Sequence, residues 1–251
     1  MAACRCGVAE AALALSMLFL AGLLRGFSGF GFAIAAMPLL SLLRPPAEVV
    51  PVVLLLQAAI SVQGLRGAWA AADWASLRWM LPGAVLATPL GLAALAMLPA
   101  APVRLVIAGL VFATVAALAR GFRLVAMAGP PWALGSGILA GLCNGLAAMP
   151  GPPVIAFYLA APLRAGAGRA AMIVLFLFTS LAGLLPMAAL GRVGVESLVL
   201  AGLGVAPVWG GSALGAALYA RSPEARYRRV ALWMLAATGV AAAARVVFGG
   251  A

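Results

Sequence analysis

Apolar residues occur in long runs along this chain, separated by short clusters of Arg, Pro and Gly. Such runs are typical of helices that cross a membrane, which need about 20 residues each. The pattern predicts helical segments at 9–24, 31–43, 46–65, 75–98, 102–119, 131–148, 151–161, 169–190, 196–219 and 227–248. No linker is long enough for a soluble domain, so we expect a polytopic helical membrane protein.

Glycine and proline interrupt this pattern twice, in stretches 22–38 and 137–153. The first stretch contains Gly22, Gly26, Gly29 and Gly31. Each glycine costs a helix about 1 kcal/mol relative to alanine. Irregular backbone inside a bilayer is tolerated only where protein or water satisfies it. Each break is therefore either a place where helices pack closely or a binding site. We call the two helical segments on either side of a break a broken pair.

The second stretch repeats features of the first. After 119 positions, Gly22 and Gly26 fall on Gly141 and Gly145. Nearer the end of each half a shift of 124 fits better, and it places Gly91 on Gly215. Repetition at a fixed distance indicates an internal duplication. We predict two membrane repeats, residues 1–125 and 126–251, that form one transport unit.

The distribution of the arginines favours one of two possible membrane topologies. If each broken pair crosses the membrane once, the 15 arginines other than Arg25 divide seven against eight. If each pair enters and returns as a hairpin, ten lie on one side and five on the other. The second division fits the positive-inside rule, with both termini outside. Each half then has one re-entrant hairpin and three crossings. The prediction is an all-α polytopic membrane protein of two inverted repeats, an architecture of many secondary transporters.

Composition supports the membrane interpretation. Hydrophobic residues make up 66% and charged residues 8% of the chain, against about 25% charged in soluble domains. The net charge of +11 comes from single arginines at the ends of apolar runs. We interpret them as topological charges beside a lipid bilayer, and expect no nucleic-acid partner. Three cysteines without histidine make a poor metal set, so no metal or cofactor is expected. Without histidine or a buried acid pair, an enzyme is not expected either.

Candidate chemistry concentrates at the two breaks. A helix N-terminus carries about half a positive charge and unpaired N–H groups, which suit an anion. The second half-helix of each pair begins near 29–32 or near 150–153. Two such ends entering from opposite faces would converge on one anionic ligand. Ser28 and Asn144 add neutral donors, and Arg25 adds a full charge that is a functional candidate inside a membrane. Alternatively, Arg25 snorkels to the interface or caps carbonyl groups.

Glycines at the breaks would allow a ligand to approach the backbone, although close helix packing produces the same signal. Polar residues of the crossing after each hairpin would flank the site, or instead form interhelical hydrogen bonds. No Asp or Glu lies convincingly at mid-membrane, so no carboxylate proton relay is visible. The predicted substrate-binding residues are Arg25, Gly26, Ser28, Gly29, Gly31, Gln57, Ser61, Asn144, Gly145, Gly151, Pro152 and Ser180.

Two motifs carry a resemblance to a known family. They are Gly26-Phe-Ser-Gly-Phe-Gly-Phe-Ala-Ile-Ala-Ala-Met-Pro38 and Gly145-Leu-Ala-Ala-Met-Pro-Gly151-Pro152-Pro153. With them the chain resembles the sulfite exporter TauE/SafE family, also called the four-toluene sulfonate uptake permease family, over nearly its whole length. The resemblance implies a bacterial inner-membrane transporter of small anions such as sulfite, sulfonates or organic acids. Members often have Gly where this chain has Pro150, so the second turn is expected to be stiffer.

The leading hypothesis is a secondary transporter of a small organic or sulfur-containing anion that works by alternating access. One alternative is a channel or carrier for another small solute or a metal cation, for which carboxylates or histidines at depth would be expected. Another is a non-transporting accessory subunit. The sequence favours neither import nor export and indicates no oligomeric state.

Overall fold

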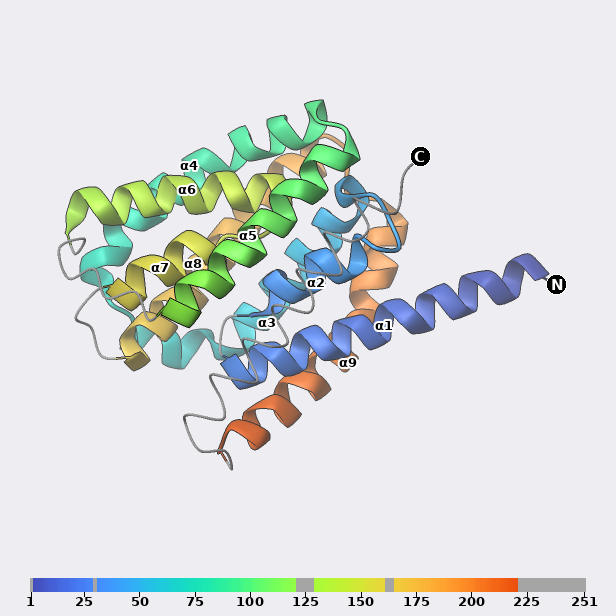
Figure 1. Ribbon diagram of the computed structural model, residues 1–251, viewed down its shortest axis with the longest axis horizontal. Coiled ribbons are helices and arrows are strands. Elements are labelled where there is room, and N and C mark those ends of the chain that lie inside the picture. The colour runs from blue at the N-terminus through green and yellow to red at the C-terminus, as the bar shows by residue number, and fades with distance from the viewer. Residues whose placement is uncertain (1, 29–30, 121–128, 161–164, 221–251) are drawn as a thin grey trace.

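The computed structural model describes residues 2–28, 31–120, 129–160 and 165–220, and within these ranges every regular element is a helix (Figure 1). The predicted segment 227–248 lies outside them. The helices are α1 (Ala2–Ser28), α2 (Phe32–Leu40), α3 (Pro46–Ala71), α4 (Trp74–Met97), α5 (Ala100–Arg120), α6 (Pro130–Ala147), α7 (Gly151–Ala160), α8 (Ala165–Ala189) and α9 (Val195–Ala220).

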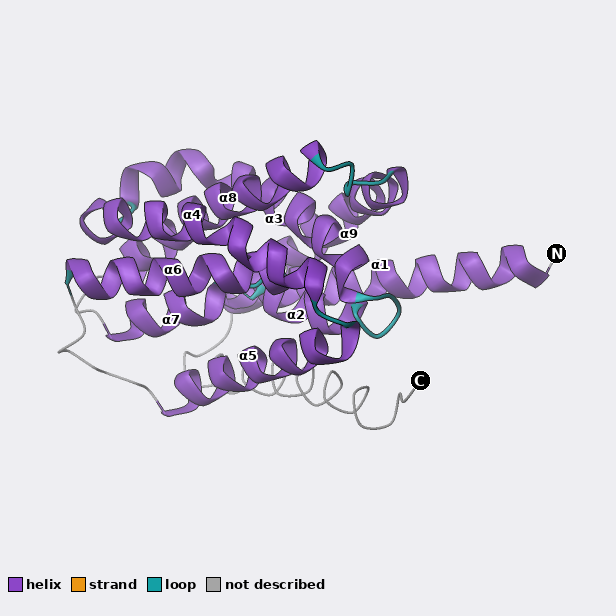
Figure 2. Cartoon of the chain, turned by 90° about the horizontal axis from the view of Figure 1, so that it is seen from above, coloured by secondary structure: helices purple, strands orange, loops and turns teal. Residues whose placement is uncertain are grey.

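Five of these helices are long and apolar enough to cross a membrane, by length and composition: α1, α3, α4, α8 and α9. The helices α2 and α7 have 9 and 10 residues, too few to span a hydrocarbon core about 30 Å thick. The view from above shows the same helical assembly, with the described connections between helices drawn as teal loops (Figure 2). The predicted all-α, polytopic membrane architecture is confirmed.

The first helix differs from its prediction. The glycines were expected to end it near residue 24, but α1 has 27 residues and continues to Ser28. A Cβ added at Gly22 or Gly26 would lie within 3.0 Å of the backbone of α9. These glycines therefore bring two helices together instead of breaking one. As a result α1 rises roughly 40 Å, which is long enough to cross a membrane where a shorter half-helix was expected.

Two pairs of parallel helices share one packing register. α1 packs along α9, and α4 packs along α6 (Figure 1). In both pairs a glycine meets the backbone of the partner helix, at Gly22–Val208 and Gly26–Ser212 in one and at Gly141–Ala84 and Gly145–Thr88 in the other. From one pair to the other the glycines are offset by 119 positions and their partners by 124. These are the two offsets of the sequence repeat.

The helices α3 and α8 form an antiparallel pair between the two parallel pairs. Leu54 of α3 lies against Gly183 of α8, and Gly64 of α3 lies against Ile173. Residue numbers rise along one helix as they fall along the other. α3 also contacts α9, and α8 also contacts α4. The polar residues predicted to flank the site lie in this central pair.

Each short helix runs back along the long helix before it. Arg44, just after α2, forms an ion pair with Glu10 near the start of α1. Tyr158 of α7 has its hydroxyl 3.0 Å from the hydroxyl of Ser76 at the start of α4, and α4 runs parallel to α6. Both predicted pairs are therefore helical hairpins.

Candidate functional site

The two hairpin tips lie where the helices stop and restart. In the first hairpin α1 ends at Ser28 and α2 begins at Phe32. In the second, α6 ends at Ala147 and α7 begins at Gly151. Gly29 lies outside the described residues, as does the side chain of Ser28. Residues 147–152 are buried, so the second tip lies inside the bundle.

The N-terminal ends of α2 and α7 are neighbours. A Cβ added at Gly151, the first residue of α7, would lie 3.2 Å from the Cδ1 atom of Ile34 in the first turn of α2. Gly31, Gly151 and Pro152 are all buried at these ends. Because a helix N-terminus favours negative charge, two adjacent N-termini make this region suitable for an anion.

Ala148 holds the turn of the second tip in a conformation that favours glycine. Its φ of 50° and ψ of 27° lie in the left-handed region, which costs an L-residue roughly 1–2 kcal/mol. Its N–H donates to the carbonyl of Asn144 at 2.7 Å, so the turn directly follows a predicted site residue. A shift of 119 positions places it on Gly29.

We expect Ala148→Gly to raise the free energy of unfolding by up to about 1 kcal/mol, because glycine adopts the left-handed conformation without steric cost. Unfolding of the purified protein in detergent, followed by circular dichroism, measures this. Ala147→Gly is the matched control. Ala147 is the last residue of α6, and glycine there is expected to lower the stability by about 1 kcal/mol. Equal losses in both variants would contradict the strain at Ala148.

Arg25 lies in α1 and points to α3. Its Nη2 donates to the carbonyl oxygen of Ile60 at 3.4 Å. Its Nη1 is buried and has no hydrogen-bond partner within the described part of the chain. Burying a charged hydrogen-bond donor costs free energy unless the donor has an acceptor. The Nη1 atom of Arg25 is therefore available to a ligand.

Asn144 has the corresponding position in the second half. Its Nδ2 donates to the carbonyl oxygen of Thr179 at 2.8 Å, and its Oδ1 is buried without a partner among the residues described. Asn144 lies 119 positions after Arg25, and Thr179 lies 119 positions after Ile60. The two halves thus make the same contact with a charged side chain in one and a neutral side chain in the other.

Gln57 and Ser61 of α3 add two further buried polar atoms. They lie between the two contacts that join α3 to α8, and neither Gln57 Oε1 nor Ser61 Oγ has a partner in the described ranges. Buried polar atoms are nearly always satisfied in folded proteins, so this cluster also suits a polar ligand. Ser180 differs, because its hydroxyl donates to the carbonyl of Phe176 in its own helix at 2.7 Å.

Gly26 and Gly145 are accounted for by helix packing. Gly26 lies against Ser212 of α9, and Gly145 lies against Thr88 of α4. In both places the neighbour is backbone, which leaves no room for a Cβ. This is the alternative that the sequence left open for these glycines. A ligand contact at either residue stays a prediction.

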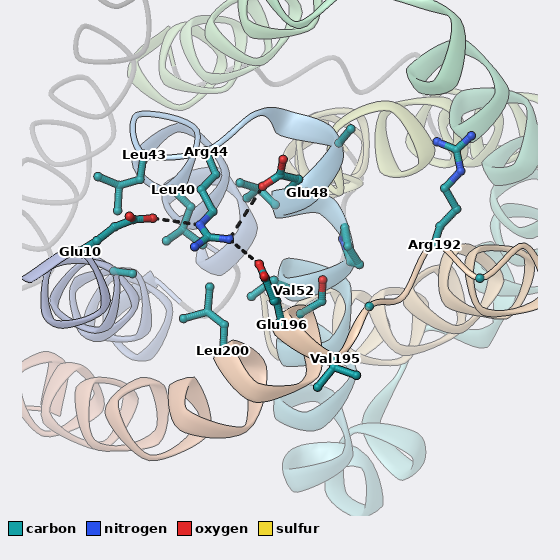
Figure 3. A pocket seen from close by; sticks show the side chains of 17 residues that line it. Glu10, Leu40, Leu43, Arg44, Glu48, Val52, Arg192, Val195, Glu196 and Leu200 are labelled. Carbon is teal, nitrogen blue, oxygen red and sulfur yellow. Dashed lines mark hydrogen bonds and ion pairs between the residues drawn. The ribbon is translucent and has the colours of Figure 1, made fainter. Parts of the chain in front are cut away.

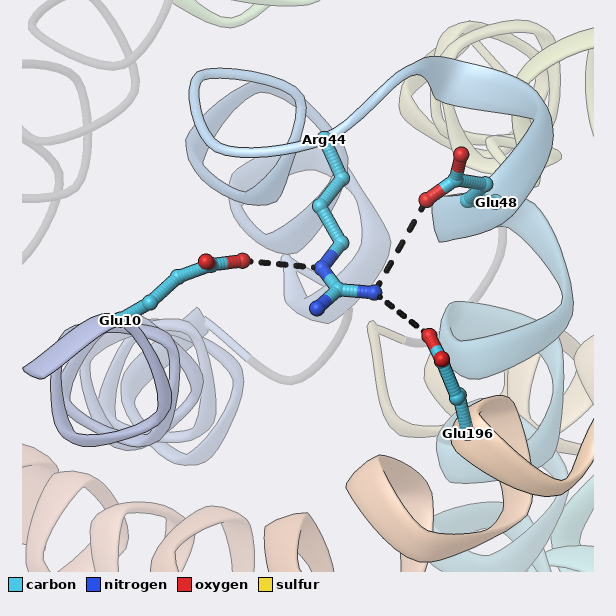
Figure 4. Close-up of polar contacts among 4 residues, drawn as sticks. All are labelled: Glu10, Arg44, Glu48 and Glu196. Atoms are coloured by element: carbon cyan, nitrogen blue, oxygen red, sulfur yellow. Dashed lines mark hydrogen bonds and ion pairs between the residues drawn. The ribbon is translucent and has the colours of Figure 1, made fainter. Parts of the chain in front are cut away.

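A cluster of charged residues was missed by sequence reasoning. Arg44, Glu10, Glu48 and Glu196 form the Arg44 network, in which the guanidinium lies among three carboxylates (Figure 4). Hydrogen bonds to Glu10 and Glu196 raise the pKa of Arg44 above its usual value, so the side chain stays charged. The four residues line a cavity of about 440 Å³ (Figure 3). The sequence feature that could have indicated this cluster is the position of Glu48 and Glu196, each in the first turn of its helix.

The model of one protein family, sulfite exporter TauE/SafE, matches residues 14–242. This chain belongs to the TauE/SafE family. The match covers both hairpins and most of the chain, and it makes the protein a member of a family of membrane transporters. No curated protein and no solved structure matched the chain.

Proposed function

We propose that the protein is a secondary transporter of a small organic or sulfur-containing anion, of the sulfite, sulfonate or organic-acid class, in the bacterial inner membrane. The observation that carries the proposal is the unpartnered, buried Nη1 of Arg25. An arginine at membrane depth is retained where it has a function. Its guanidinium has the geometry that binds sulfonate-like and carboxylate oxygens.

The remaining polar groups support the same ligand. The N-termini of α2 and α7 meet at Ile34 and Gly151, and each contributes a partial positive charge. Asn144 Oδ1 and Ser61 Oγ are buried and unpartnered in the described ranges. The hydroxyl of Ser61 can donate a hydrogen bond to an anion, whereas the carbonyl oxygen of Asn144 accepts a hydrogen bond from a hydroxyl or amino group. A small anion that carries such a donor would satisfy both.

Alternating access would follow from two inverted repeats. α3 and α8 correspond under the 119-residue shift, and they run antiparallel against each other. The parallel pairs α1/α9 and α4/α6 repeat one register of glycine contacts. Halves related in this way can exchange conformations, which exposes a shared central site to each side in turn. Both chain termini would then lie in the periplasm, as the arginine distribution favours.

The proposal is tested by ligand binding to the purified protein. Thermal unfolding would be followed with sulfite, thiosulfate, taurine, sulfoacetate, sulfolactate and small carboxylates, each at millimolar concentration. A true ligand should raise the melting temperature in proportion to the logarithm of its concentration. We expect at least one of the anions to stabilise the parent protein, and the same anion to drive counterflow in proteoliposomes. Stabilisation only by cations or neutral solutes would refute the anion site.

A further inference from the structure

The Arg44 network joins three separate parts of the fold through one side chain. The Nε of Arg44 lies 2.9 Å from Glu10 of α1, and its Nη1 lies 3.0 Å from Glu196 of α9. Glu48, in the first turn of α3, lies 3.8 Å from the same Nη1. These carboxylates are three of the five acidic residues in the whole chain. A surface rich in charged residues therefore does not explain why these three carboxylates meet at one arginine.

The network lies at a cavity that is otherwise mostly apolar. Leu40, Val52 and Leu200 contribute to its walls. Figure 3 shows the carboxylates of Glu10, Glu48 and Glu196 turned toward the Arg44 guanidinium, whereas Arg192 stands apart on another wall. The volume of about 440 Å³ is enough for a small organic solute. The ion pairs thus join the walls of a solute-sized space.

The helix α2 connects the network to the candidate ligand site. The N–H of Arg44 donates to the carbonyl of Leu40, the last residue of α2, at 3.1 Å. The opposite end of α2 begins at Phe32, beside the N-terminus of α7. Nine helical residues rise roughly 13 Å. A displacement of α2 at the hairpin tip would therefore carry Arg44 with it.

We propose that the Arg44 network is a gate at this end of the bundle, closed when Arg44 holds α1, α3 and α9 together and opened when α2 moves. The link to ligand binding rests on the proposed function, but the gate is a property of the ligand-free protein. The side chains are 40–86% exposed, so each ion pair is weak and the network is easily broken and remade. A fully buried ion pair would not open so easily.

The gate is tested by the reactivity of a cysteine beneath it. Val52 lines the cavity and is 3% exposed. A Val52→Cys reporter would be made in a protein whose three native cysteines are replaced by alanine. Its reaction rate with a water-soluble maleimide would be measured in detergent without added anion. We expect Arg44→Gln to raise this rate about two- to tenfold, the range set by losing partly exposed ion pairs.

Matched variants separate a gate from a change in folding. Arg192→Gln removes a positive charge from the same cavity but leaves the network intact, and it should not change the rate. Glu196→Gln alters a side chain that is 86% exposed and should raise the rate without unfolding the protein. The exchange Arg44→Glu with Glu196→Arg should slow the reaction relative to Arg44→Glu alone.

The outcomes of this experiment are distinct. An unchanged rate in both Arg44→Gln and Glu196→Gln would overturn the gate, whatever the protein transports. A faster rate in both, with Arg192→Gln unaffected, would support it even if no anion binds. If no anion of the panel then stabilises the protein or changes the rate of the Val52→Cys reporter, the proposed anion transport is refuted while the gate stands.

Discussion

Arg25→Gln is expected to weaken anion binding at the hairpin tips by at least about 30-fold. The substitution removes the charged group whose Nη1 is buried without a partner among described residues. Loss of a charged hydrogen-bonding partner in a desolvated site costs about 2–5 kcal/mol of binding free energy, and 2 kcal/mol corresponds to about 30-fold. Isothermal titration with the anion that stabilises the parent most strongly would measure the loss. Glutamine retains a donor for the carbonyl of Ile60, so the fold should be kept.

Two further variants test what Arg25 does. Arg66→Gln also removes an arginine, but Arg66 is exposed on α3, and binding should not change. The exchange Arg25→Asn with Asn144→Arg moves the charge to the corresponding position of the second half. It should recover part of the affinity that Arg25→Asn loses, if both residues contact one ligand. Unchanged affinity in Arg25→Gln would instead make Arg25 a cap for the carbonyl of Ile60.

The helical segments could be predicted because lipid imposes a simple rule. A chain in a bilayer must satisfy its backbone internally, so apolar runs such as 46–65 and 75–98 become helices, here α3 and α4. The predicted end of the first helix at residue 24 was wrong, because the prediction considered only the intrinsic helix propensity of glycine. At Gly22 and Gly26 the neighbouring α9 decides instead. Tertiary packing of this kind is not visible in a local stretch of sequence.

The candidate site was predictable in part. Arg25 and Asn144 stood out as polar residues beside breaks in apolar runs, and the structure places both in matching contacts with α3 and α8. The receiving carbonyl groups could not be predicted, because every residue has one and only the helix register selects it. The Arg44 network was missed because Glu196 lies 152 positions from Arg44 in the chain. Single charges at helix ends already have an explanation in membrane topology.

Gly141→Ala is expected to lower the free energy of unfolding by about 2–3 kcal/mol. A Cβ at this position would lie less than 3.0 Å from the Cβ of Ala87 and from the backbone of Ala84 in α4. Backbone atoms cannot turn aside, so α4 and α6 would have to separate, and overpacking costs of this kind are typically 1–3 kcal/mol. Reversible unfolding in mixed micelles, followed by circular dichroism, would measure the change.

Gly135→Ala is the control, because Gly135 lies in the same helix but has no atom within 4 Å of its added Cβ. Alanine there should stabilise α6 by about 0.5–1 kcal/mol. The two substitutions are chemically identical, so their opposite signs would isolate the contact between α4 and α6 from helix propensity. Gly22→Ala should behave as Gly141→Ala does, since its Cβ would meet the backbone of Val208 in the corresponding contact. A stabilising Gly141→Ala would remove the physical reason for the register that the two halves share.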